Sequence, residues 1–295
     1  MIIPFNNSIS NSIFDYDARE FITTCGITNS QVVRNINDCF KELKKEDIWD
    51  CIFYGFALVF AGTTQSMLID IKSRETLTTF TPISGFTNSA TFSSNGVKFN
   101  QGEYLLKSSP PFTFLLNTDS GPGHISIYNR TNYNLMGLTG TSKHGYLEPF
   151  GGYEQSISFS PNGVSASLWN KNGPMSFTTS STSGFFLFSN IDDNNGLTAS
   201  TSNPYTFYLS RNGQVIGSQS STRNYHTLGS NVVIGAYADI LSDPSIRSFD
   251  EISWYSIGSG FGNSISGRQI DIYKQEKFYQ IIQKLQITLG REIDI

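Results

Sequence analysis

The stretch that decides the fold is Tyr205-Thr-Phe-Tyr-Leu-Ser-Arg-Asn-Gly-Gln-Val-Ile-Gly217. Aromatic and β-branched residues fill both halves, and Asn212-Gly213 separates them. An Asn-Gly pair tolerates the positive φ angles of a type I′ turn, which matches the twist of two antiparallel strands. Alternating side chains along such strands face opposite sides of a sheet. This stretch therefore predicts a β-hairpin.

The same signal recurs along the chain, at Asn95-Gly96, Asn162-Gly163, Asn172-Gly173 and Asn195-Gly196. Between such turns lie short apolar runs at 91–99, 125–128, 156–160, 164–169, 185–188, 231–237 and 252–257. Only 15% of the residues are charged and 14% are aromatic, which suits many short strands joined by polar turns. We expect a mainly β fold with two packed sheets, of the jelly-roll sandwich type.

Helical periodicity is confined to the two ends of the chain. Val32, Ile36 and Leu43 repeat at helical spacing after a capping residue, Thr28 or Asn29. A shorter helix is expected from Asp15 to about Thr24, and the apolar segment that starts at Ile48 completes a compact helical module. Near the other end, apolar residues at 278, 281, 282, 285 and 289 predict a last helix that ends at Gly290.

These patterns divide the chain into four parts. We predict an N-terminal arm (1–14), a helical docking module (15–60), a β-sandwich (61–265) and a C-terminal helix packed on the body (266–290).

Composition argues against several partners and compartments. The net charge is −4 without a basic stripe, so a nucleic acid partner is not expected. The longest apolar stretch, 52–61, is far shorter than the roughly 20 residues that cross a bilayer, so membrane insertion is not expected either. The start of the sequence does not resemble a secretory signal, which predicts that the protein is made and assembled in a cytoplasm. Cys25, Cys39 and Cys51 form no CxxC pattern and are expected to be plain thiols.

Several segments resemble a family of structural proteins from phages of Bacteroidetes, including crAss-like phages. The closing segments of the family read "SIGDGL", then a helix, then "QTTLGR". They resemble Tyr255-Ser-Ile-Gly-Ser-Gly260 and Gln286-Ile-Thr-Leu-Gly-Arg-Glu-Ile293 here. The opening of the family resembles 18–23, 26–29 and Ile48-Trp49, and its middle resembles 208–213 and 233–237.

This resemblance spans nearly the whole chain and implies a concanavalin A-like (laminin-G-like) sandwich in a virion. The family segment after the tryptophan, "YPFVGG", is replaced here by 51–62, so the way in which the N-terminal module meets the sandwich is not carried over. The family supplies no catalytic residue.

Signs of enzyme chemistry are weak. His124, His144 and His226 are far apart and lack metal-site spacing, and nucleophile-elbow and phosphate-loop motifs are missing. Glycoside hydrolysis is the enzyme alternative, since it needs two facing carboxylates. The acidic residues near aromatics, Glu148, Glu154, Asp250 and Glu251, form no ExDxxE strand motif. We therefore predict that the protein is not an enzyme.

Carbohydrate binding without hydrolysis is more plausible, because aromatic faces are platforms for sugars. The candidates are Tyr133, Tyr146, Tyr153 and Trp169, which lie in or near polar turns; the alternative is that they are core or interface aromatics. Asp192 and Asp193 are candidate calcium ligands, although such a run more often forms a plain turn. No other cofactor is expected.

The resulting prediction is a structural component of a tailed-phage virion, such as a capsid decoration, collar or tail/fibre protein. Its expected partners are other virion proteins, in a homo-oligomer or symmetric array, with host-surface contact as a possible addition. The alternative is a carbohydrate-binding adhesin for host attachment, and a glycoside hydrolase is the least favoured.

Overall fold

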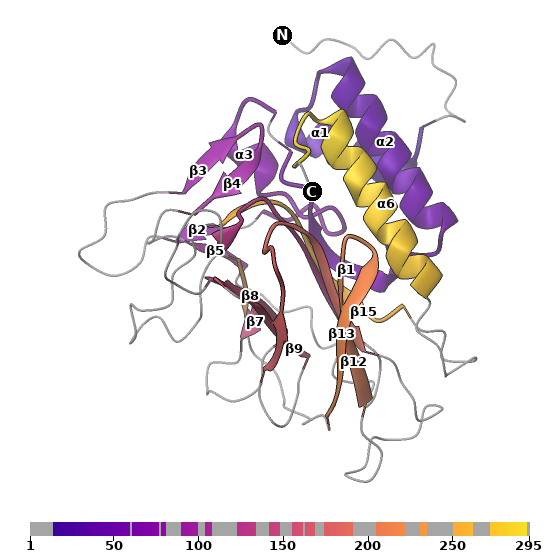
Figure 1. Cartoon of the computed structure of the whole chain (residues 1–295). Helices are drawn as coiled ribbons and strands as arrows, with labels where there is room; N and C mark the ends of the chain where they lie inside the picture. The colour runs from indigo at the N-terminus through magenta and orange to yellow at the C-terminus, as the bar shows by residue number, and fades with distance from the viewer. Residues whose placement is uncertain are drawn as a thin grey trace, which may run out of the picture.

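The computed structural model describes residues 14–59, 61–76, 78–80, 90–99, 104–107, 123–133, 142–147, 155–161, 163–168, 174–190, 205–221, 231–234, 250–261 and 272–293. Within these residues, the protein is a β-sandwich of two antiparallel sheets with a layer of helices over one of them (Figure 1). The jelly-roll-like sandwich predicted from the sequence is confirmed.

The sheet next to the helices, here called the central sheet, has eight strands. Its order is β13 (Gln214–Ser221), β12 (Tyr205–Arg211), β11 (Gly184–Asn190), β6 (Gly123–Asn129), β15 (Glu251–Ser259), β4 (Gly96–Lys98) and β3 (Thr91–Ser93), with β1 (Ile52–Phe56) also paired to β15. The outer sheet has the order β10 (Met175–Thr178), β9 (Gly163–Leu168), β8 (Gln155–Ser160), β7 (Ser142–Leu147), β14 (Asn231–Ile234), β5 (Tyr104–Lys107) and β2 (Thr78–Phe80). Every predicted apolar run contains a strand.

The hairpin predicted around Asn212-Gly213 is confirmed as β12 and β13. Arg211 pairs with Gln214 across the turn, and Asn212 and Gly213 have φ angles of 52° and 79°. A two-residue turn with both φ angles positive is the geometry that Asn-Gly favours.

The middle strands of the central sheet, β11, β6 and β15, are buried on both faces. Phe186 and Phe188 of β11 point into the core between the two sheets, whereas Phe185 and Leu187 point into a second core under the helices. The strand alternation sends successive side chains to opposite faces. This explains why β11 begins Gly-Phe-Phe-Leu-Phe, with no polar residue at every second position.

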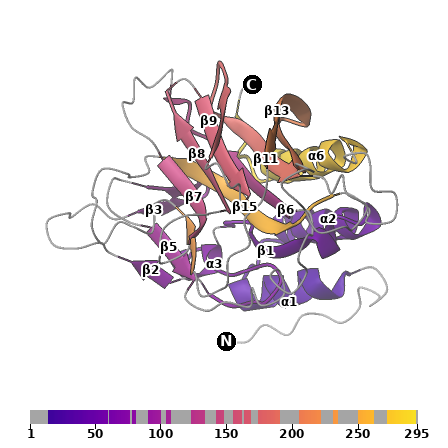
Figure 2. The same cartoon turned by 90° about the horizontal axis from the view of Figure 1, so that it is seen from below.

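Three helices cover the face of the central sheet that is turned away from the outer sheet: α1 (Tyr16–Cys25), α2 (Ser30–Lys45) and α6 (Ile272–Thr288). Figure 2 shows all three on one side of the central sheet, although α6 is far from the others in sequence. Asn29 caps α2 by accepting from the backbone N–H of Gln31 (2.9 Å), and Gly26, with φ 68°, ends α1. None of the helices in the described part of the chain is long and apolar enough to cross a bilayer.

Residues 52–56, which the sequence analysis assigned to the helical module, form strand β1. A 3₁₀ turn (Trp49–Cys51) ends the helical part, and β1 then pairs with β15 from Ile52 to Phe56. A short apolar run has no period that separates a buried helix from a buried strand. A four-residue helix, α3 (Thr64–Met67), follows in the next connection.

The C-terminal segment after α6 is fastened by Arg291. This side chain is 1% exposed, and its guanidinium donates to the carbonyls of Leu58 (2.8 Å) and Ala57 (3.1 Å). Burial and the neighbouring Arg130 lower the pKa of Arg291 to about 9. Arg130 in turn donates to the Arg291 carbonyl and lies 3.7 Å from the carboxylate of Glu251. Arg291 therefore joins the segment after α6 to the residues that follow β1.

We predict that Arg291→Met lowers the free energy of unfolding by about 2 kcal/mol, because hydrogen bonds from charged donors to buried carbonyls are lost. Urea denaturation followed by tryptophan fluorescence measures this change. Arg19→Met, in an exposed position on α1, is the matched control and should change stability by less than about 0.5 kcal/mol. Equal effects of the two substitutions would contradict the role assigned to Arg291.

Candidate functional site

A broad hollow lies between the β12–β13 turn and α6. Its volume is about 610 Å³, and it opens broadly to solvent. It is lined by Arg211, Asn212, Gly213, Gln214, Ile216, Glu276, Tyr279 and Gln280. We call it the hairpin–helix depression.

The turn is held in place by Asn212. Its backbone N–H donates to the carbonyl of Phe185 (2.8 Å), and its side-chain oxygen accepts from the N–H of Phe185 (2.9 Å). Gly184, with φ 128°, leaves room for this amide, since a Cβ there would be 2.6 Å from the Asn212 oxygen. The tip of the hairpin is thus fixed to the start of β11.

Gly213 allows the turn to approach α6 closely. A Cβ on Gly213 would be 3.0 Å from Cδ1 of Tyr279 and 3.5 Å from Cα of Glu276. Tyr279 also contacts Phe185, with 6.3 Å between ring centroids. Its ring is half-buried and is held between the turn and the second core.

The polar groups of the depression balance in charge. Arg211 donates from Nε to the carbonyl of Ser183 (2.9 Å), and burial lowers its pKa. Burial also raises the pKa of Tyr279, so at neutral pH the phenol is protonated and the guanidinium is charged. Glu276 accepts a hydrogen bond from the amide of Gln280 (3.0 Å). One ring with amide, guanidinium and carboxylate groups around it suits a ligand rich in hydroxyl groups.

Gly213→Ala tests the close approach of the turn to α6. We predict a loss of about 2 kcal/mol or more in the free energy of unfolding, from positive φ and from contact with Tyr279. Gly26→Ala is the matched control: its φ is 68° but nothing lies within 4 Å of the added Cβ, so about 1 kcal/mol is expected. Equilibrium urea unfolding compares the two, and equal losses would argue against a tight turn–helix contact.

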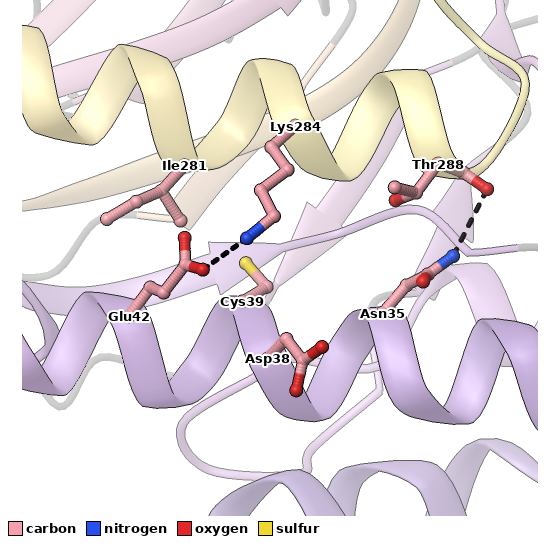
Figure 3. A pocket seen from close by; sticks show the side chains of 7 residues that line it. All are labelled: Asn35, Asp38, Cys39, Glu42, Ile281, Lys284 and Thr288. Atoms are coloured by element: carbon pink, nitrogen blue, oxygen red, sulfur yellow. Dashed lines mark hydrogen bonds and ion pairs between the residues drawn. The ribbon is translucent and has the colours of Figure 1, made fainter.

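A second, much smaller hollow lies between α2 and α6 (Figure 3). It holds about 20 Å³, roughly the space of one water. The ion pair between Lys284 and Glu42 crosses it, and the amide of Asn35 donates to the carbonyl of Thr288 (3.1 Å). Burial raises the pKa of the Cys39 thiol at its edge, which stays protonated. This crevice is a seam between helices and not a ligand site.

A serine and a histidine meet under the helices. Nε2 of His124 is 3.2 Å from Oγ of Ser256, which is 2.6 Å from Oγ of Ser126, and Trp254 donates to Ser126 (3.1 Å). His124 is fully buried beside Phe261, and burial lowers its pKa to about 4. A buried pair without solvent access cannot receive a substrate, so we assign this network to packing between the central sheet and the helices.

The buried His124 predicts a pH dependence of stability. Its pKa is about 4 in the folded state and near 6.5 when unfolded, so between these values the unfolded chain binds one more proton. Stability should fall as the pH drops through this window, by roughly 3 kcal/mol in total. In His124→Gln the fall should be smaller by that amount, although the variant is less stable at pH 8. Urea midpoints between pH 4 and pH 8 measure both slopes, and parallel slopes would disprove the assignment.

Of the residues proposed from sequence as sugar platforms, only Tyr133 has a described side chain, and it is not among the residues that line the depression. Tyr133 is fully buried in the core between the sheets and exposes no ring face to a ligand. For this residue the alternative interpretation, a core aromatic, fits the structure. The backbone of Tyr146 lies in β7, opposite Gln155 and Val232. Tyr153, Trp169, Asp192 and Asp193 lie outside the described residues.

The acidic residues considered for hydrolysis have structural partners where they are described. Asp250 is fully buried, and Glu251 lies beside Arg130. Glu148 and Glu154 lie outside the described residues. Among the described residues, Glu276 is the one carboxylate that lines the depression, whereas most glycosidases use two at about 5–10 Å. Within the described ranges, His, Cys, Asp and Glu side chains form no group of three that could hold a metal.

The sequence analysis missed the depression because it arises from two distant segments. The Asn212-Gly213 turn was visible, and so was the amphipathic helix. What the sequence did not indicate is that the turn docks on that helix. The one signal of this contact in the sequence was Tyr279, which lies beside the apolar residues of α6.

Comparisons with known proteins give limited information. No family model and no curated protein matches the sequence. Among solved structures, the binding domain of botulinum neurotoxin DC in complex with rat synaptotagmin II is 11% identical, with a TM-score of 0.48 over 79% of this chain and 52% of that one. A second receptor-binding domain has a TM-score of 0.48 at 11% identity over 84% and 53% of the chains. The binding domain of botulinum neurotoxin serotype G has a TM-score of 0.45 at 15% identity over 78% and 51%. This chain therefore spans about half the length of each of these structures, and the fold assignment above comes from its own strand pairing.

Proposed function

We propose that this protein is a non-enzymatic, surface-binding component of a tailed-phage virion and that it binds a carbohydrate of the host surface. The observation that carries the proposal is the hairpin–helix depression. It combines a positioned tyrosine ring with side chains that donate and accept hydrogen bonds, and one carboxylate is found among its described lining residues.

The chemistry of the depression favours a neutral, hydroxyl-rich ligand. Tyr279 presents a ring to stack on the apolar face of a sugar, while Gln214, Gln280 and Arg211 supply donors for its hydroxyl groups. The charges of Arg211 and Glu276 offset each other, so an acidic or basic polymer gains little there. A lipid would need a more apolar lining.

The aromatic residues singled out from the sequence form a second proposed contact region. Tyr146, Tyr153 and Trp169 are proposed to stack on further sugar units, and Asp192 and Asp193 are proposed to bind calcium. Extended polysaccharides offer many sugar units to one protein, so two contact regions are compatible.

Membership of a virion is supported by the sequence resemblance in both ends and the middle of the chain. A purely architectural role in a capsid decoration, collar or tail/fibre is the second candidate function, and the exposed edge strand described below favours it. In that case the partners are other virion proteins, and the host glycan is dispensable. Both roles place the protein in the virion.

A glycan array and a host-cell binding assay test the proposal, each with and without calcium. We expect saturable binding that Tyr279→Ala weakens at least tenfold, because a stacking platform is lost. The matched control is Tyr273→Ala, on the same helix but 57% exposed and outside the depression, which should bind normally.

The same assays separate the alternatives. Loss of binding in Trp169→Ala or Tyr146→Ala, with Tyr279→Ala unaffected, would move the site to the sequence-predicted region. A folded protein that binds no glycan and no host cell would leave the architectural role. Folding of each variant is checked by circular dichroism.

A further inference from the structure

Strand β13 is the outermost strand at its end of the central sheet. Its inner side pairs with β12 along its whole length, from Gln214 to Ser221. Residues 214–216 and 218–220 are all exposed, and Val215 and Ile216 are 41% and 38% exposed. Because hydrogen-bonding groups alternate along an antiparallel ladder, about half of the N–H and C=O groups of β13 point away from β12.

The other terminal strands are protected in a way that β13 is not. Among the described strands, β3 and β2 have three residues each and β10 has four, whereas β13 has eight. Short strands, charges and prolines are the usual means of preventing edge pairing. The β13 sequence Gln-Val-Ile-Gly-Ser-Gln-Ser-Ser contains neither charge nor proline. A bulge between Val215 and Gly217 is its one irregularity, and residues 217–221 pair regularly.

We propose that a second copy of this chain pairs antiparallel with β13, so that the central sheets of two molecules join into one. Charge favours an identical partner, because a neutral strand meets its own copy without like charges facing each other. Serine and glutamine side chains donate and accept equally, so they suit a two-fold contact in which each residue meets an equivalent one.

The neighbouring edge of the outer sheet enlarges this interface. The amide of Gln219 donates to the carbonyl of Ser176 in β10 (3.0 Å), so the terminal strands of both sheets lie on the same side of the sandwich. A strand pair alone is smaller than a standard interface of about 1,600 Å², so we expect a dimer that dissociates on dilution.

Pairing has a consequence for the hairpin–helix depression, and this consequence rests on the proposed function. Gln214 and Ile216 belong both to β13 and to the depression. With a two-fold axis near Ser218, the two Gln214 positions would lie roughly 25 Å apart. Two depressions at this spacing would bind one polysaccharide or a dense glycan surface with avidity.

Analytical ultracentrifugation of the full chain across a wide concentration range tests the dimer. We expect a reversible monomer–dimer equilibrium that Ser218→Lys weakens at least tenfold, because two like charges then face each other near the axis. Thr91→Lys, on the terminal strand β3 at the opposite end of the sheet, is the matched control and should leave the equilibrium unchanged. Urea midpoints show whether both variants fold.

Disulfide trapping tests the strand register independently. Single cysteines are placed at 216, 218 and 220 in a Cys51→Ser background, because Cys51 is the one native thiol that is not fully buried. We expect a covalent dimer whose yield peaks at one of these positions, as an antiparallel two-fold contact requires. The Cys51→Ser background without an added cysteine should stay monomeric under denaturing conditions.

A chain that is monomeric at every concentration and gives no trapped dimer would overturn the proposal, even if it pairs with a different virion protein. A dimer that Thr91→Lys disrupts and Ser218→Lys does not would also overturn it. The consequence for glycan binding is tested separately. Ser218→Lys should keep the affinity for a soluble oligosaccharide and lose only the avidity for a dense glycan surface. Absence of any glycan binding would refute the proposed function and leave the dimer result standing.

Discussion

The structure depends on the burial of the central sheet from both sides. Each of its middle strands sends alternate side chains into two separate cores, one shared with the outer sheet and one shared with the helices. In β15, Tyr255 and Ile257 belong to the first core, and Trp254 belongs to the second. The helices are therefore part of the folded body, since without them the face that carries Trp254 would be exposed to water.

The depression is a product of the same constraint. The position of α6 is fixed by Phe278, which packs against Phe185 and Trp254 of the sheet. The distances between ring centroids are 5.2 Å to Phe185 and 6.1 Å to Trp254. With α6 fixed there, the hairpin tip meets it at Gly213, and Tyr279 is held at the border between core and solvent. The side chains proposed to bind a sugar therefore lie on rigid elements, and such groups need little reordering on binding.

Local sequence signals predicted most of the elements but not the contacts between them. Asn212-Gly213 predicted its hairpin because a turn with two positive φ angles has few alternatives. Thr28 or Asn29 predicted the start of a helix because both side chains can cap one. The run after Trp49 was misassigned, since a doubly buried strand shows no alternation. The depression required knowledge of which helix face the turn touches, and Tyr133 could be placed in the core only by the tertiary structure. Local patterns carry no information about either.

The order of the chain gives α6 and Arg291 a role in biosynthesis. Helix α6 and Arg291 follow all the described strands in the sequence, so a ribosome completes these strands before it adds the last helix that covers the central sheet. Until then, the nascent protein exposes an apolar surface that chaperones can recognise. A prematurely terminated chain would keep that surface and would be removed or would aggregate. Folded molecules are thereby enriched in those translated through to Arg291.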